Sequence, residues 1–508
     1  MNAEPPEQRP PDHKLDELRA QKPTKEAVAA KAVSGAAIVA VRNVLLLVLS
    51  FGAYTVLARE LSPHQFGTVA IGMAIVAFAG TLSNAGLGGA LVSSAVQIDE
   101  PTLKSVFGLE LVVTTTLWCL IALVALPFFG LIGQLTTVMA LALPLGACVT
   151  PVSIVLERSL VYQTLARIEL SQAIIYYLWA IGAVSLGMGV WGLVTAVLVR
   201  SLSTIVLYAR ARRDLFFLPS FSYARVRPLL RFGIKYQGTG FITVIRDEGL
   251  NLGIAAIAGT SVLGVWSLAQ NILQVPFALF QTLWRVSFPA TAQLIEAGAD
   301  AGRLIHRGAK VTVIGTGLVL APLAAGAPGL VPAIFGARWH EAGLVVPIAC
   351  IALVISGPVS VATAGFLWAS GDASAVLRAT LAHSVVWLGA TFAMLPLIGV
   401  LAIPIGWNIG SAVDLILLAR YAGRHVPLNL GHEIAWPGMA AELAGAVGFA
   451  CAFFAGKTFV SGVAGVIIAL VTFTVLLLAR ERTQTIELGR TILGAMSGGR
   501  GSDAVSSA

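Results

Sequence analysis

Long apolar runs, separated by short polar connections, fill most of the chain between residues 32 and 480. A membrane-spanning helix needs roughly 20 mostly apolar residues, and its backbone groups must be hydrogen-bonded within the helix because lipid offers no partners. The pattern therefore predicts an all-α polytopic membrane protein with about 14 transmembrane helices. We expect these helices near residues 32–58, 66–95, 105–129, 134–156, 168–187, 190–209, 232–257, 261–285, 309–335, 342–368, 376–396, 399–420, 434–456 and 458–479.

The longest polar connection, residues 210–231, separates the first six predicted spans from the remaining eight. The segment 66–75 after the first span resembles the segment 263–272 after the seventh, which indicates either an internal repeat of the kind common in transporters or chance similarity between apolar helices. We predict a disordered cytosolic tail at 1–31, an N-terminal lobe at 32–225, a C-terminal lobe at 226–432, two further helices at 433–480 and a cytosolic tail at 481–508.

Basic residues are distributed unevenly between the two sets of connections. Of the 33 Lys and Arg, only Arg59, Arg338 and Lys457 fall in connections on the side opposite the N-terminus. Cytoplasmic loops carry the excess of Lys and Arg in membrane proteins, so both termini are predicted to be cytoplasmic. The opposite side has only short connections, which leaves no room there for an extracytoplasmic domain.

Composition agrees with lipid as the main solvent. Charged residues make up 11% of the chain and AVILMFWYC residues 57%, whereas a soluble domain carries roughly 25% charged residues. The net charge of +8 does not indicate nucleic-acid binding, because the basic residues sit in short loops between apolar runs. The four cysteines lie inside apolar runs without metal-ligand spacing, and we expect them to be small packing residues.

Signatures of catalysis and cofactor binding are missing or incomplete. The chain has no GxxxxGK[ST] loop, so we expect no ATP hydrolysis by the chain itself. The His-Glu pairs at 340–341 and 432–433 lack the second histidine of HExxH. Residues 187–192 match GxGxxG, but they join two apolar helices and no acidic residue follows about 20 positions later, so a tight hairpin is the better interpretation. We predict no cofactor, no metal and no enzyme activity.

Charged and amide side chains inside the apolar runs are the candidate functional residues. Each ionised residue at mid-helix costs roughly 2.5–3.5 kcal/mol on insertion scales, so such residues should face a bundle interior or a hydrated cavity. The alternative for any one of them is an ion pair between helices, for example Arg42 with Glu110. Our candidates for the lining of a cavity that binds substrate are Arg42, Arg246, Asp247, Arg285, Asn271, Gln274 and Asp414.

Four segments resemble motifs of the Wzx-type polysaccharide flippases. Residues 57–67 (LARELSPHQFG) are similar to that family's AR-LSP-x-x-FG signature, and residues 84–91 to its D-x-GLG-x-AL stretch, with Asn84 in place of the usual acid. Residues 157–169 resemble the motif that follows the fourth span, and residues 247–276 resemble the hairpin of the seventh and eighth spans.

The resemblance implies the multidrug/oligosaccharidyl-lipid/polysaccharide exporter superfamily, with two pseudo-symmetric six-helix lobes around a central cavity and two extra C-terminal helices. It also implies a bacterial inner-membrane flippase that moves undecaprenyl-pyrophosphate-linked oligosaccharide to the periplasmic leaflet for exopolysaccharide, capsule or O-antigen assembly. Membrane lipid, a polymerase and glycosyltransferases of the same pathway would be its partners. Related flippases place arginines on the first and eighth spans, which points to Arg42 and Arg285 as contacts for pyrophosphate.

Two alternatives stay open. One is a cation-coupled drug exporter of the same superfamily, against which the flippase motifs and the embedded arginines count. The other is a membrane polysaccharide polymerase or ligase. By resemblance, such enzymes carry a large outside loop or an acidic pair in the first outside loop, and this chain has only Arg59-Glu60 there.

Overall fold

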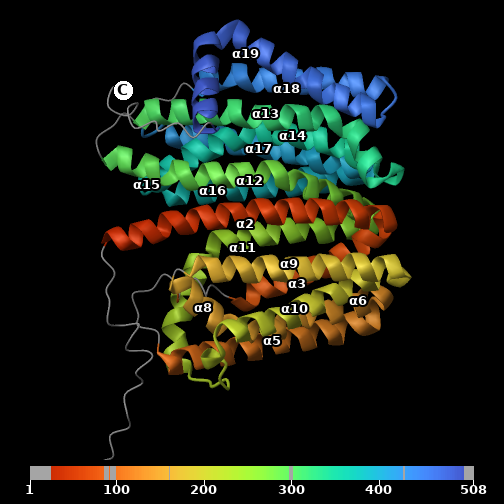
Figure 1. Cartoon of the computed structure of the whole chain (residues 1–508), viewed down its shortest axis with the longest axis vertical. Coiled ribbons are helices and arrows are strands. Elements are labelled where there is room, and N and C mark those ends of the chain that lie inside the picture. Colours follow the sequence, from red (N-terminus) through yellow and green to blue (C-terminus); the bar gives the residue numbers. More distant parts are fainter. Residues whose placement is uncertain are drawn as a thin grey trace, which may run out of the picture.

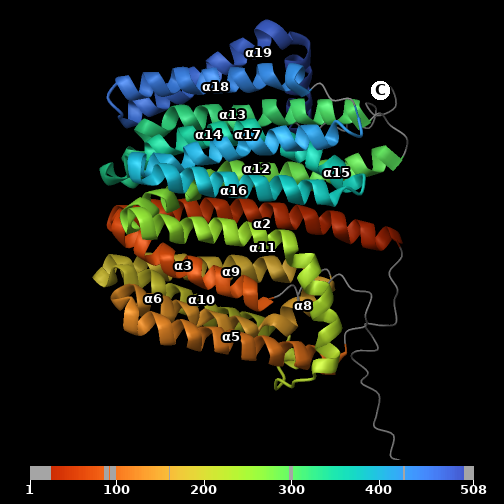
Figure 2. The ribbon, with the colours of Figure 1, turned by 180° about the vertical axis from the view of Figure 1, so that it is seen from behind.

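Long helices, lying side by side, make up the computed structural model of this protein (Figure 1). The structure describes residues 25–84, 91, 99–159, 161–296, 301–426 and 430–496. Within these ranges the chain forms helices and turns and no β-strand. The N-terminal helices gather in one half of the molecule and the later helices in the other, as both views show (Figure 2). The predicted all-α, two-lobed architecture is therefore confirmed.

The N-terminal lobe contains a broken fourth helix. The expected span at 134–156 is divided where Leu141 and Val149 interrupt the helical hydrogen bonding. Its fifth and sixth helices join through a π-turn in which Gly187 has φ 87°, so the GxGxxG match is a tight hairpin as predicted. The elements are α2 (Lys25–Glu60), α3 (Pro63–Asn84), α5 (Glu100–Phe128), α6 (Gly130–Ala140), α7 (Ala142–Ala147), α8 (Thr150–Arg158), α9 (Tyr162–Ala183), η1 (Val184–Met188) and α10 (Val190–Ala211).

The first long helix of the C-terminal lobe, α11, begins earlier than the expected span at 232. Helix α11 starts inside the arginine-rich connection, and its first turns cross the ends of the N-terminal helices (Figure 2). The elements are η2 (Arg213–Leu215), α11 (Tyr223–Ala258), α12 (Thr260–Glu296), α13 (Ala301–Phe335), η3 (Ala337–Trp339), α14 (Ala342–Val359), η4 (Ser360–Ala364), α15 (Gly365–Ala369), α16 (Ala373–Ile398), η5 (Gly399–Leu401) and α17 (Ala402–Ala422), followed by α18 (Leu430–Phe454) and α19 (Phe459–Met496).

Eleven stretches of the described chain are long and apolar enough to cross a membrane. One of them, Ala373–Ala422, has 50 residues and contains both α16 and α17. Helices α11 and α12 lie in the same bundle but are not among the eleven. The protein is a multi-pass membrane protein, and the number of 14 spans stays a prediction.

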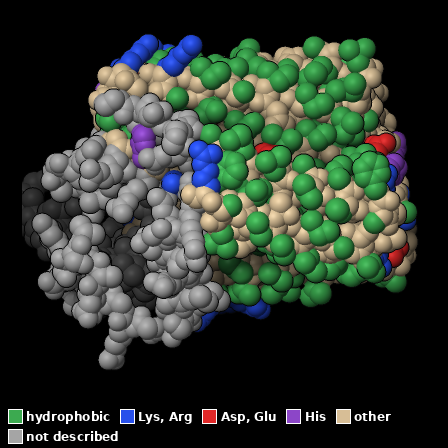
Figure 3. Space-filling model, turned by 90° about the horizontal axis from the view of Figure 1, so that it is seen from above, with side chains coloured by type: hydrophobic (Ala, Val, Ile, Leu, Met, Phe, Trp, Pro, Cys, Tyr) green, Lys and Arg blue, Asp and Glu red, His purple; other side chains and the backbone are tan. Residues whose placement is uncertain are grey.

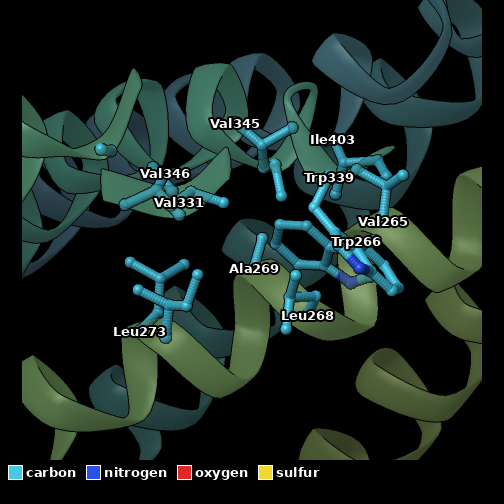
Figure 4. Packing of buried hydrophobic residues seen from close by; sticks show 14 of the residues in the cluster. Val265, Trp266, Leu268, Ala269, Leu273, Val331, Trp339, Val345, Val346 and Ile403 are labelled. Carbon is cyan, nitrogen blue, oxygen red and sulfur yellow. The ribbon is translucent and has the colours of Figure 1, made fainter. Parts of the chain in front are cut away.

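Apolar packing is continuous through the C-terminal lobe. Figure 4 shows side chains of α12, among them Trp266 and Leu273, beside Val331 of α13 and Val345 of α14. Trp266 exposes 1% of its surface and Val345 none, so these helices meet without a solvent-filled gap at this point. Because it is closely packed, the C-terminal lobe should be rigid where it faces the N-terminal lobe.

The two halves of the suggested repeat meet at α3 and α12. A Cβ atom at Gly67 would overlap the carbonyl oxygen of Thr260, and a Cβ atom at Gly264 would overlap the carbonyl oxygen of Pro63. The contact is reciprocal, because the backbone at each glycine packs against the first turn of the other helix. The segments 66–75 and 263–272 therefore occupy matching places in the two lobes, which favours a true repeat over chance similarity.

Helices α18 and α19 lie along the outer side of the C-terminal lobe (Figures 1 and 2). Glycines permit the close approach: a Cβ atom at Gly329 of α13 would collide with the backbone of Thr458 and Gly462. Seen from this side, hydrophobic side chains cover most of the described face and charged ones gather near its ends (Figure 3). Such a surface suits contact with lipid.

Candidate functional site

A cavity of about 220 Å³ lies between the two lobes. Both lobes contribute to its wall. The apolar part comes mainly from α3, and most polar groups come from α2, α9, α11 and α12. The lining residues are Tyr54, Leu57, Phe66, Val69, Ala70, Met73, Ala74, Ala77, Tyr176, Tyr177, Leu193, Glu248, Asn251, Ser267, Gln270 and Asn271.

Polar groups of the wall lie close to one another, both within helices and between them. The hydroxyl group of Tyr54 of α2 lies beside the side chain of Asn271 of α12, at the boundary between the lobes. Asn251 Nδ2 donates to Glu248 Oε2 (3.0 Å), and Asn271 Nδ2 donates to the carbonyl oxygen of Ser267 (2.8 Å). Phenol, amide and carboxylate groups can exchange such bonds for bonds to a ligand's hydroxyl groups. Together with aromatic faces, this set suits a sugar.

A charged cluster, Arg42 with Glu169 and Arg200, belongs to the N-terminal lobe. Arg42 of α2 forms an ion pair with Glu169 of α9 and donates from Nη2 to Asn43 Oδ1 (2.8 Å). Arg200 of α10 is near enough for its charge to act on Glu169 and on the cavity residue Tyr177. Arg42 lies about 18 Å before Tyr54 along α2, at 1.5 Å per residue. The cluster therefore lies beyond the cavity, toward the end of the bundle where α2 begins.

The suggested pairing of Arg42 with Glu110 is wrong. The side chain of Glu110 of α5 lies instead beside Thr150, at the start of α8. The acid that meets Arg42 is Glu169 of α9, a helix that begins at Tyr162, earlier than the expected start of that span at 168. Glu169 thus sits two turns inside a helix that packs directly against α2.

A second cluster, around Arg246, belongs to the C-terminal lobe. Arg246 Nε donates to Asp247 Oδ1 (2.7 Å), and the guanidinium carbon lies 5.3 Å from the ring centre of Trp387. Asp414 Oδ2 of α17 accepts a hydrogen bond from Ser360 Oγ (3.3 Å), and Asp414 is near enough to Arg246 to interact with its charge. Consecutive residues on a helix point about 100° apart, so Glu248 reaches the cavity while Arg246 faces α16.

The seven candidate residues therefore occupy different places. Asn271 is on the cavity wall, and Gln274, one turn further along α12, is exposed. Arg42 belongs to the N-terminal cluster, and Arg246, Asp247 and Asp414 belong to the cluster in the other lobe. The side chain of Arg285 lies outside the described residues. Whether any of them contacts substrate stays a prediction.

Sequence reasoning did not select the tyrosines of the wall. Tyr54, Tyr176 and Tyr177 stand in apolar runs whose mean hydropathy their neighbours keep high. The adjacent pair at 176–177 was the available signal, since a tyrosine in mid-span needs a partner for its hydroxyl group. Among the described residues, no three His, Cys, Asp or Glu side chains come together as a metal site.

Comparison with solved structures supports the fold. The lipid II flippase MurJ in an inward closed conformation superposes with a TM-score of 0.66 at 12% identity, covering 89% of this chain and all of that one. An inward-facing multidrug resistance MATE transporter superposes with a TM-score of 0.56 at 17% identity, covering 76% of this chain and 98% of that one. Both likenesses concern the arrangement of helices alone.

Two curated relatives are each 27% identical to the chain over the part that aligns. One is the lipopolysaccharide biosynthesis protein WzxC of Escherichia coli (strain K12), over 63% of this chain and 66% of the relative. The other is the succinoglycan biosynthesis transport protein ExoT of Rhizobium meliloti (strain 1021), over 61% of this chain and 64% of the relative. The matched part therefore spans slightly less than two thirds of each relative.

A family model described as "Polysaccharide biosynthesis protein" matches residues 56–347, which is more than half of the chain. The match runs from the end of α2 to the first turns of α14, so it includes most of the cavity wall. The protein belongs to this family of polysaccharide biosynthesis proteins, as its Wzx-type motifs predicted.

Proposed function

We propose that the protein is a flippase that carries an undecaprenyl-pyrophosphate-linked oligosaccharide from the cytoplasmic to the periplasmic leaflet. The observation that carries the proposal is the inter-lobe cavity, whose wall combines tyrosine rings with amide, hydroxyl and carboxylate groups. An oligosaccharide offers many hydroxyl groups and apolar ring faces, and both find partners on such a wall. Membership of the family supports a role in polysaccharide assembly, together with glycosyltransferases and a polymerase as pathway partners.

The arginine clusters suit the other end of the proposed substrate. A pyrophosphate group carries at least two negative charges, and a guanidinium group can bind its oxygens in a bidentate manner. Arg42 and Arg200 lie between the cavity and the end of the bundle where α2 begins, and the charge bias predicts that this end is cytoplasmic. We propose that the sugar occupies the cavity while the pyrophosphate stays near these arginines.

The rival functions have less support. A polymerase or ligase with a large outside loop is disfavoured, since the connections between α2 and α3 and between α11 and α12 are turns of a few residues. A cation-coupled drug exporter shares the fold, but the family match and the polar wall favour a glycan.

Deletion of the gene tests the proposal. We expect lipid-linked repeat units to accumulate on the cytoplasmic leaflet and one surface polymer to disappear. Complementation with Asn271→Ala should leave export impaired at normal protein level, because this change removes a polar group of the wall. Complementation with Tyr223→Phe, which alters an exposed tyrosine outside the cavity, should restore export. Normal polymer with altered drug sensitivity would favour the exporter.

A further inference from the structure

The turn between α2 and α3 meets the turn between α13 and α14, and the two lobes exchange hydrogen bonds there. Arg59, at the end of α2, donates from Nε to the carbonyl oxygen of Ile334 (2.8 Å) and from Nη2 to that of Ala333 (3.1 Å). Both carbonyls belong to the last turn of α13, which has no further helical N–H groups to bond them. The guanidinium group also lies at the negative end of the helix dipole.

The exchange also runs in the opposite direction. Arg338 Nη2 donates to the carbonyl oxygen of Arg59 (2.9 Å), and Trp339 Nε1 donates to that of Ala58 (2.8 Å). These carbonyls belong to the last turn of α2. Each of the two helices is therefore capped at its C-terminus by side chains of the other lobe, a reciprocal arrangement that can exist only while the lobes are together at this end.

The remaining residues of the segment 57–67 hold the turn in position. Ser62 N–H donates to Gln65 Oε1 (2.9 Å), and Gln65 N–H donates to Ser62 Oγ (3.3 Å), so a capping box starts α3. The ring of Phe66 then meets Trp339 edge to face, with ring centres 5.1 Å apart. Gly67 allows the first turn of α12 to approach the backbone of α3. The contacts of Phe66 and Gly67 position α3 against the other lobe.

The same residues form one end of the cavity. Leu57 and Phe66 line it, while Ala58 and Trp339 are fully buried just beyond them. Arg59 and Arg338 are exposed on the far side. The structure is thus closed between the cavity and the side that the charge bias assigns to the periplasm.

We propose that Ala58, Arg59, Ala333, Ile334, Arg338 and Trp339 form a clasp that closes the cavity toward the periplasm and must part for substrate to leave. The proposal rests on the proposed function and on the predicted orientation. Parting of the lobes breaks all four hydrogen bonds together. The guanidinium groups of Arg59 and Arg338 are exposed already, so water can replace the lost hydrogen bonds. The clasp can therefore open without leaving a buried charge unpaired.

Accessibility of the cavity from outside tests the clasp. In full-length protein with its four cysteines replaced, Ala70→Cys on the cavity wall is labelled in intact cells by a membrane-impermeant thiol reagent. Combining Arg59→Ala with Arg338→Ala should raise the labelling rate about tenfold, since three of the four bonds are lost. Lys457→Ala is the matched control. It removes a cation assigned to the same side, on the turn between α18 and α19, and should leave the rate unchanged.

A second variant covers the possibility that the double variant does not accumulate. Trp339→Phe removes one hydrogen bond and retains most of the buried aromatic surface, so it should raise labelling by a smaller factor. Unchanged labelling in whichever variant accumulates would overturn the clasp. Raised labelling in a protein whose deletion leaves surface polymer intact would uphold the clasp and overturn the proposed substrate, because the labelling assay needs no substrate.

Discussion

The ion pair between Arg42 and Glu169 offers the sharpest test of which embedded charges support the fold and which serve the proposed transport. Three variants are needed: Arg42→Ala, Glu169→Ala and the double variant. Their effects should be unequal. Arg42→Ala leaves Glu169 beside the charge of Arg200, whereas Glu169→Ala leaves two arginines near each other with no acid between them.

The size of the effect follows from burial. The Arg42 side chain is 18% exposed and that of Glu169 33% exposed. Removing one partner of a fully buried pair costs about 3–5 kcal/mol, and a fully exposed pair contributes about 0–1 kcal/mol. For this partly buried pair we expect a loss of about 1–2 kcal/mol for Arg42→Ala and about 2–3 kcal/mol for Glu169→Ala.

Protein level and thermal unfolding of the purified variants measure the loss of stability. The amount of surface polymer measures export. The double variant should recover much of the stability lost in Glu169→Ala but should not recover export, since Arg42 is proposed to contact pyrophosphate. Glu110→Ala is the comparison, because Glu110 lies beside Thr150 and should show no coupling to Arg42. Recovery of both stability and export in the double variant would make Arg42 purely structural and refute its place in the site.

Three further outcomes are expected. A cysteine at Arg338 should react with an impermeant thiol reagent in intact cells and one at Arg225 should not; the reverse result would invert the topology. Gly67→Ala should lower the amount of folded protein, because its Cβ would overlap the first turn of α12, whereas Gly52→Ala has open space and should be neutral in an expression assay. Asp99→Ala should destabilise the start of α5 by about 1 kcal/mol at neutral pH, because Asp99 caps that helix. Hydrogen bonding from the Thr102 side chain and then contact with Arg225 lower the pKa of Asp99, so the difference from the parent in thermal unfolding should begin to shrink as pH falls below about 4 and should be lost at still lower pH.

Hydropathy predicted the architecture because every span in lipid must be an apolar helix of roughly 20 residues. This requirement predicts where the helices lie, but not where they break or extend beyond the membrane. Leu141 and Val149, which interrupt the fourth helix, look like any other apolar residues. The early start of α11 was hidden by its arginines, since a helix that crosses the ends of other helices at the membrane surface need not be apolar.

The candidate site was predicted less well, for a geometric reason. The sequence shows that Arg42 needs a partner, but the partner depends on which helix packs against α2 and how it is rotated. Glu110 and Glu169 were equally available by composition, and packing brings only the latter to Arg42. The wall of the cavity depends on Tyr54 and Tyr177, which are inconspicuous in an apolar run and become significant only when the lobes meet.

The glycine contacts of α18 and α19 have a practical consequence. Gly448 and Gly465 let the backbones of α18 and α19 come into contact, and Gly329 of α13 packs against the start of α19. The two helices should therefore move together with the C-terminal lobe as one rigid body. A fluorophore on the turn at Lys457 would then act as a pointer for that lobe, well away from the cavity. Paired with a second dye on the N-terminal lobe, it would let single molecules be watched through a transport cycle without altering any residue that touches the cargo.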